Sequence, residues 1–132
     1  MTVLVDSNVL IDLIDPEAEW HGWSSDHVSR LVDAGEGLVI NPVIYAEVSI
    51  PFDDADDVEA LLTPWTREAL PFPAAFLAGK AFRSYRRAGG AKTSPLPDFF
   101  IGAHAQAAGH RLLTRDAARY RTYFPDVDLI AP

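Results

Sequence analysis

The stretch MTVLVDSNVLIDLID, residues 1–15, joins a short apolar run to the start of a helical pattern. Val3 to Val5 are apolar in succession, which is typical of a strand buried on both faces of a parallel sheet. The run ends at Asp6, although strands disfavour Asp and rarely bury it without a partner. In an open α/β sheet, the carboxyl ends of the strands carry the ligand site. Asp6 is therefore either a ligand at that edge or, like Ser7, a cap of the next helix.

Strand-like and helix-like segments alternate along the rest of the chain. Strands are predicted at 3–5, 38–40, 70–72, 112–114 and 128–130, and helices at 8–14, 24–34, 42–49, 53–68, 73–88, 97–108 and 116–123. Pro64 should bend or end the helix over 53–68, and loops are predicted at 17–22 and 91–96. The alternation predicts an α/β fold with a mainly parallel sheet and helices on both faces, in one domain over 1–132.

The composition narrows the class of protein. Eleven basic and 19 acidic residues give a net charge of −8, which argues mildly against non-specific nucleic-acid binding but suits clustered carboxylates or a basic partner. The absence of cysteine excludes disulfides and thiolate ligands. Because neither a membrane span nor a signal peptide is recognisable, we expect a cytoplasmic protein that does not enter membranes.

Four carboxylates are predicted to meet at the carboxyl edge of the sheet. Asp6 and Asp116 directly follow predicted strands, whereas Glu47 and Asp98 lie in helices that begin near the same edge. Gathered carboxylates repel one another, and Mg²⁺ prefers oxygen ligands, so a divalent cation would stabilise the group. Taken singly, Asp98 could be a first-turn helix acid, Asp116 an N-cap and Glu47 a surface residue.

Four blocks of the chain together resemble the PIN domain family, and within it the VapC toxins of type II toxin–antitoxin systems. The blocks are VLVDSNVLIDL, NPVIYAEV, PLPDFFIGAHAQAAGHRLLTRD and YFPDVDLI, which in this order span nearly the whole chain. The third block is the most specific, since it combines Asp98, a helix, a strand and then Thr-Arg-Asp. The resemblance implies a compact three-layer α/β/α sandwich.

The resemblance also implies a metal-dependent ribonuclease. The catalytic acids of the family fall on Asp6, Glu47, Asp98 and Asp116. Asp6, Asp98 and Asp116 would hold Mg²⁺ or Mn²⁺, and metal-activated water would hydrolyse RNA. Asn8 and Thr114 match the smaller polar positions that line such sites.

The family pattern further implies an antitoxin partner and a homodimer. Apolar residues in 43–52 and 58–76 support an interface, because they exceed what one small core requires. One departure concerns Arg119, which lies where many relatives carry a further acid, so a second metal would be weakly held or absent.

Positive charge for RNA is concentrated in two places. Arg83, Arg86 and Arg87 fall on or near one helix face, which could equally be a solvated surface, and Arg115 adjoins Asp116. The four histidines share no ligand spacing, and we assign them no role.

Two other function classes compete with the nuclease. A phosphotransfer domain of the response-regulator or haloacid-dehalogenase type also places an Asp after its first strand. The dehalogenase type needs a second Asp where this chain has Asn8, and a receiver domain needs paired acids and a later lysine. A PIN-like module that only binds RNA or protein, with weak catalysis, is the stronger alternative, although all four acidic positions are filled.

Overall fold

The computed structural model describes residues 2–93 and 96–132. Five strands form one parallel sheet in the order β3-β2-β1-β4-β5. They are β1 (Thr2–Val5), β2 (Gly37–Ile40), β3 (Thr66–Arg67), β4 (Arg111–Leu113) and β5 (Leu129–Ile130). The predicted α/β fold with a parallel sheet is confirmed.

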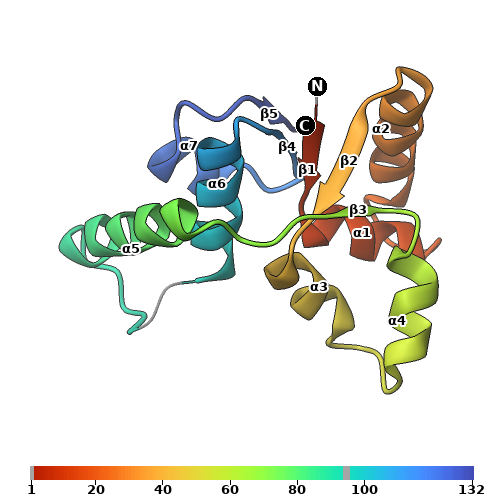
Figure 1. The fold of residues 1–132 in the computed structure, drawn as a ribbon, viewed down its shortest axis with the longest axis horizontal. Helices are drawn as coiled ribbons and strands as arrows, with labels where there is room; N and C mark the ends of the chain where they lie inside the picture. The colour runs from red at the N-terminus through yellow and green to blue at the C-terminus, as the bar shows by residue number, and fades with distance from the viewer. Residues whose placement is uncertain (1, 94–95) are drawn as a thin grey trace.

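Helices cover both faces of this sheet, so the predicted three-layer arrangement is also confirmed. The helices are α1 (Ser7–Ile14), α2 (His21–Asp33), α3 (Pro42–Ser49), α4 (Ala55–Leu62), α5 (Phe72–Arg87), α6 (Pro97–Ala108) and α7 (Ala118–Tyr123). Figure 1 shows α2 on one side of β1 and β2, with α5, α6 and α7 on the other. The successive apolar residues Val3, Leu4 and Val5 are fully buried because β1 is the central strand.

Several predicted boundaries are wrong. The third strand is Thr66–Arg67, not 70–72, because Pro71 and Pro73 favour the start of α5 at Phe72. The helix predicted over 53–68 covers only Ala55–Leu62, since Pro64 ends it as expected. Helix α2 begins at His21, inside the predicted loop over 17–22, and α7 begins at Ala118. The predicted loop over 91–96 includes residues 94 and 95, which lie outside the described residues.

The parallel arrangement aligns the ends of the strands that position the polar residues. Asp6 follows β1, Asn41 follows β2 and Thr114 follows β4, and all three are buried. The main-chain N–H of Asp6 donates to the Leu113 carbonyl at 2.9 Å, which continues the β1–β4 pairing to the sheet edge. Within the described residues, no helix is long and apolar enough to cross a membrane.

Candidate active site

Asp6 lies at the centre of a hydrogen-bonded group at the carboxyl edge of the sheet. It occupies the N-cap position of α1, but its side chain makes no capping bond, so the capping alternative for Asp6 is wrong. Its Oδ2 accepts from the Tyr120 hydroxyl at 2.7 Å and the Thr114 hydroxyl at 2.9 Å, with Asn8 Nδ2 at 3.4 Å. Within the described residues, the one side-chain donor to its Oδ1 is the Ser7 hydroxyl, at 3.3 Å. Oδ1 is therefore the oxygen with coordination capacity left.

Ser7 and Tyr120 connect Asp6 to two of the other predicted acids. The Ser7 hydroxyl donates to Glu47 Oε1 at 2.8 Å, so Ser7 does not cap the helix either. The Tyr120 hydroxyl, which donates to Asp6, lies 3.4 Å from Asp98 Oδ1. Three carboxylates from α3, α6 and the end of β1 thus meet around two hydroxyl groups.

The electrostatics of this group are unfavourable for charge. Burial raises the pKa of Asp6 above its usual value, and the Asp98 carboxylate adds to the rise despite the bond from Tyr120. Burial likewise raises the pKa of Glu47, with a contribution from both aspartates. Burial also raises the pKa of Asp98, as does Asp116, against the lowering effect of Arg119. These effects place Asp6, Glu47 and Asp98 within electrostatic reach of one another, and Asp116 within reach of Asp98.

Asp116 sits at the exposed side of the group and is held through its main chain. Its N–H donates to the Thr114 hydroxyl oxygen at 3.1 Å, and that oxygen also accepts from Asn8 Nδ2 at 3.2 Å. Since α7 begins at Ala118 with Ala117 at its N-cap, the capping alternative for Asp116 is wrong. Asn8 and Thr114 therefore support Asp6 and the Asp116 main chain.

The ligand atoms of the four acids suit a hard divalent cation better than a lysine or arginine side chain. Asp6 Oδ1, Glu47, Asp98 and Asp116 offer only carboxylate oxygens, which are the ligands that Mg²⁺ and Mn²⁺ prefer. Burial is the main cause of the raised pKa of Asp6, Glu47 and Asp98, and a cation would also remove the repulsion that adds to it. The only cationic contact to this set within the described residues is Arg119, whose Nη1 lies 3.4 Å from Asp98 Oδ2.

A cavity of about 380 Å³ opens beside the acids. It is lined by Asp98, Asp116, Tyr85, Arg119 and Tyr123, among others. The Arg119 guanidinium stacks over the rings of Phe99 and Tyr85, at 5.7 and 6.0 Å from their centroids. The hollow is thus polar at its acidic end and aromatic at its wall.

The predicted RNA-binding arginines differ in how they are held. Arg83 and Arg87 are exposed near the end of α5. Arg86 instead donates to the carbonyls of Gly90 and Lys92, at 3.2 and 2.8 Å, and so closes its own loop. Arg115 is bound to Asp12 through Nε at 2.8 Å.

A second polar cluster lies apart from the four acids and was missed in the sequence. His104 and His110 both place Nε2 at 2.8 Å from Glu68 Oε1. Two histidines and a glutamate could hold a metal ion such as zinc. However, Asn41 Oδ1 caps α3 by accepting from Ile44 N–H at 2.9 Å, so its Nδ2 faces His104 Nδ1 as a donor at 3.0 Å.

That contact fixes the tautomer of His104. Its Nδ1 must accept, so its Nε2 carries the proton and donates to Glu68. His110 in turn contacts the Thr2 hydroxyl through Nδ1. Burial raises the pKa of Glu68, but hydrogen bonds from His110 and His104 outweigh it, and the resulting pKa lies below the usual value. The cluster is therefore a closed hydrogen-bonded network that ties the end of β3 to α6 and β4.

Sequence reasoning also missed Ser7, Asp12 and Tyr120. Ser7 could have been found, since it adjoins Asp6 and stands in the same block. Tyr120 and Asp12 carry no local signal, because only the packing of α7 and α1 brings them to the site.

Comparisons with known proteins identify the family and the fold. The family whose sequence profile matches the chain, over residues 3–125, is the PIN domain. No curated protein sequence matches. Among solved structures, VapBC2 from Rickettsia felis bound to a promoter DNA fragment is similar at a TM-score of 0.76 and 14% identity, over 100% of this chain and 99% of that chain. VapBC-1 from nontypeable Haemophilus influenzae is similar at a TM-score of 0.74 and 18% identity, over 99% of this chain and 98% of that chain. Mycobacterium tuberculosis VapC20, a sarcin–ricin loop cleaving toxin, is similar at a TM-score of 0.63 and 14% identity, over 91% of this chain and 94% of that chain.

Proposed function

The chain belongs to the PIN domain family, a family of nucleases, and we propose that it is a metal-dependent endoribonuclease acting as the toxin of a toxin–antitoxin pair. The proposal treats residues 1–132 as a single cytoplasmic domain. The observation that carries it is the meeting of Asp6, Glu47 and Asp98 around two shared hydroxyls, with a raised pKa on each carboxyl. Similar structures include VapC20, which is described as a sarcin–ricin loop cleaving toxin.

Each residue has a proposed role. Asp6 Oδ1, Asp98 and Asp116 would hold Mg²⁺ or Mn²⁺, and Glu47 would orient the attacking water or a further ion. The ion supplies neutralisation of charge at the scissile phosphate and a lowered pKa for water. Thr114 and Asn8 keep Asp6 in place through the bonds to its Oδ2. Hydrolysis of this kind leaves a 5′-phosphate and a 3′-hydroxyl.

A second metal ion, which the acidic pattern of many relatives implies, would have to bind next to the Arg119 side chain in this protein. Arg119 lies 3.4 Å from Asp98 Oδ2 and is fixed by two aromatic rings, so its charge opposes another cation at that carboxylate. We therefore propose that a single ion is held firmly.

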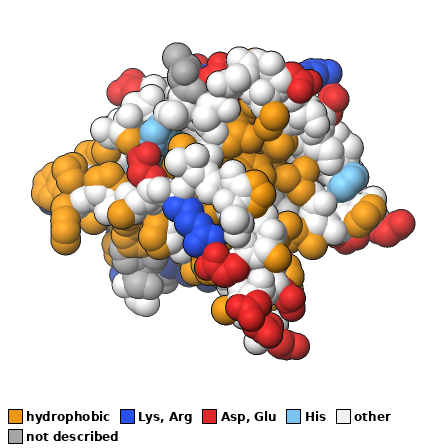
Figure 2. All heavy atoms as spheres, turned by 45° about the vertical axis from the view of Figure 1, so that its right-hand side comes forward, with side chains coloured by type: hydrophobic (Ala, Val, Ile, Leu, Met, Phe, Trp, Pro, Cys, Tyr) orange, Lys and Arg blue, Asp and Glu red, His pale blue; other side chains and the backbone are white. Residues whose placement is uncertain are grey.

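The proposed partners are RNA, an antitoxin and a second copy of the chain. Figure 2 shows acidic side chains gathered at the lower end of the molecule, where α4 begins; they include the exposed Asp53, Asp54, Asp56 and Asp57. This charge suits a basic protein segment rather than RNA. Three large apolar residues are exposed in the segments predicted to form an interface, namely Ile50, Phe72 and Phe76 at 81%, 91% and 64%.

The test is cleavage of total bacterial RNA by folded, antitoxin-free protein in Mg²⁺ or Mn²⁺. The Asp98→Asn variant and a chelator should each abolish the cuts, whereas Asp128→Asn, at the opposite end of the sheet, should not. Sequencing the new ends would name the substrate, and a 2′,3′-cyclic phosphate would overturn the mechanism. Folded protein that binds RNA or protein without cutting would instead favour the alternative of a catalytically weak binding module.

A further inference from the structure

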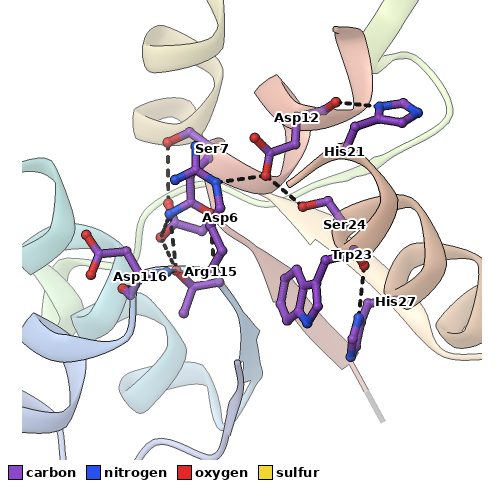
Figure 3. Close-up of polar contacts among 11 residues, drawn as sticks. Asp6, Ser7, Asp12, His21, Trp23, Ser24, His27, Arg115 and Asp116 are labelled. Carbon is purple, nitrogen blue, oxygen red and sulfur yellow. Dashed lines mark hydrogen bonds and ion pairs between the residues drawn. The ribbon is translucent and has the colours of Figure 1, made fainter. Parts of the chain in front are cut away.

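Arg115 is held from two directions at the edge of the acidic group. Its main-chain N–H donates to Asn8 Oδ1 at 3.3 Å, and its side-chain Nε donates to Asp12 Oδ2 at 2.8 Å. Asn8 and Asp12 are four residues apart on α1 and so lie on the same helix face. Figure 3 shows Arg115 between Asp116 on one side and Asp12 on the other. One face of α1 therefore fixes both the main chain and the side chain of Arg115.

The partner of Arg115 is a buried carboxylate. The Asp12 side chain is only 3% exposed, and its Oδ2 also accepts from the buried Ser24 hydroxyl at 2.7 Å. Burying a charge is costly unless it is paired. Breaking the Arg115–Asp12 pair would leave a buried carboxylate without its cation, so Asp12 holds the Arg115 side chain in place. The Arg115 side chain is nevertheless 31% exposed.

The outer part of the guanidinium is left available. Across residues 2–93 and 96–132, no acceptor contacts the two Nη groups of Arg115; only Nε is used. A planar guanidinium whose inner nitrogen is fixed presents its remaining N–H groups in a set direction, which suits a phosphate. Fixing the side chain before binding also reduces the conformational entropy lost when RNA binds.

We propose that Asp12 is a positioning residue that presents Arg115 to an RNA phosphate beside the acidic group. The inference rests on the proposed function for its substrate class and adds to it the residue that orients the phosphate contact. It also gives Asp12 a second effect, since Arg115 held by Asp12 does not fold back onto Asp6 or Asp116.

Whether Asp12→Asn strengthens or weakens RNA binding distinguishes a positioning role of Asp12 from a simple effect of its charge. Removing an anion near the site should strengthen RNA binding if only net charge matters. If Asp12 positions Arg115, Asp12→Asn should instead weaken it. Arg115→Ala should weaken binding about tenfold and lower the slope of log Kd against log salt by about 0.7, as expected for one lost phosphate contact. Asp12→Asn should weaken binding severalfold and keep the slope, because Arg115 retains its charge.

A matched arginine–aspartate pair at the start of β4 provides the control. Arg111 Nε binds Asp128 Oδ2 at 3.1 Å, the same atoms as in the Arg115–Asp12 pair, but at the opposite end of β4. Arg111→Ala and Asp128→Asn should change RNA affinity by less than about twofold, as expected for a remote charge under salt screening.

The experiment measures binding of a short fluorescein-labelled single-stranded RNA by anisotropy, over a salt series, in the Asp98→Asn background so that no cleavage is needed. The double variant Asp12→Asn, Arg115→Ala should bind like Arg115→Ala alone, because the effect of Asp12 passes through Arg115. If Asp12→Asn does not fold, Arg115→Lys tests the same point: it keeps the charge, loses the Nε contact and should weaken binding without changing the salt slope.

Two results would overturn the inference, and they are distinct. Folded Asp12→Asn that binds as tightly as its parent, or tighter, would make Asp12 only a counter-ion and leave the proposed nuclease intact. A parent protein that binds no RNA would remove the proposed function as well.

Discussion

Asp98→Asn should make the metal-free protein more stable while abolishing metal-dependent cleavage. The Tyr120 hydroxyl contacts Asp6 Oδ2 at 2.7 Å and Asp98 Oδ1 at 3.4 Å, so these two oxygens are at most about 6 Å apart. Two unit charges at about 6 Å repel by about 3 kcal/mol at an effective dielectric constant of about 20.

Only part of that repulsion should appear in the measured free energy of unfolding. The Asp98 side chain is 35% exposed and Arg119 already opposes its charge, so about one third of the repulsion should remain. We therefore expect Asp98→Asn to raise the free energy of unfolding by about 1 kcal/mol, or the Tm by about 3–5 °C. The assay is thermal unfolding in chelator at neutral pH and low salt.

The pH dependence provides an internal check. The pKa of Asp98 is raised in the folded protein, so the folded state binds its proton more tightly than the unfolded state does. The destabilisation by Asp98 is therefore present above the raised pKa and fades as the pH falls toward the ordinary value. The Tm advantage of Asp98→Asn should shrink over the same range. Saturating Mn²⁺ should raise the Tm of the unchanged protein more than that of Asp98→Asn.

The contrasting variant is Asp6→Asn, which should be destabilising. All the side-chain partners of Asp6 donate, so an amide NH₂ in place of one oxygen would face donors in a buried position. A metal-free Asp98→Asn protein that melts below the unchanged protein would refute the repulsion argument. An Asp6→Asn protein that melts above it would refute the account of Asp6 as an obligate acceptor.

Three further predictions address other parts of the molecule. Tyr120→Phe should lower the free energy of unfolding by about 1 kcal/mol and weaken Mn²⁺ binding, measured by electron paramagnetic resonance, because Asp6 Oδ2 loses its shortest bond; unchanged Mn²⁺ affinity would mean that Tyr120 does not orient Asp6. Glu68→Gln should lower the Tm at neutral pH, and the difference should vanish in acid: the lowered pKa of Glu68 stabilises the fold above its ordinary pKa, and this stability is lost as the pH falls through the folded value. A pH-independent difference would show that the charge of Glu68 is irrelevant. Phe72→Ser combined with Phe76→Ser should shift a homodimer to monomer in analytical ultracentrifugation with little change in monomer stability, since both rings are exposed; an unaltered dimer would place the interface elsewhere.

The parts of the fold that the sequence predicts are those with a strong local signal. Val3 to Val5 had to be a central strand because no polar residue interrupts them, and Pro42 and Pro97 marked helix starts correctly. The third strand was misplaced because β3 has only two residues, both exposed, and so lacks the apolar pattern that identifies strands.

The polar clusters likewise include residues that could be predicted from the sequence and residues that could not. Asp6, Glu47, Asp98 and Asp116 could be selected because strand ends and helix starts converge at one edge of a parallel sheet, an argument that needs topology alone. Glu68, His104 and His110 could not, since Glu68 follows β3, His104 lies in α6 and His110 precedes β4, so that they meet only through the packing of α6 on the sheet. Local spacing carries no information about such a contact.

Asp6 is surrounded by neutral hydrogen-bond donors rather than by arginines. A buried carboxylate is most simply stabilised by an arginine, and two arginines lie nearby. Yet the Arg115 guanidinium is bound to Asp12, and Arg119 contacts Asp98 Oδ2 and stacks on aromatic rings. Asp6 receives hydroxyl and amide donors instead. Neutral donors favour the ionised carboxylate without cancelling its charge, so the negative potential persists at Asp6 Oδ1. An arginine released from Asp12 would cancel that potential, which is why the pairing of Arg115 matters to the acids as well as to the RNA.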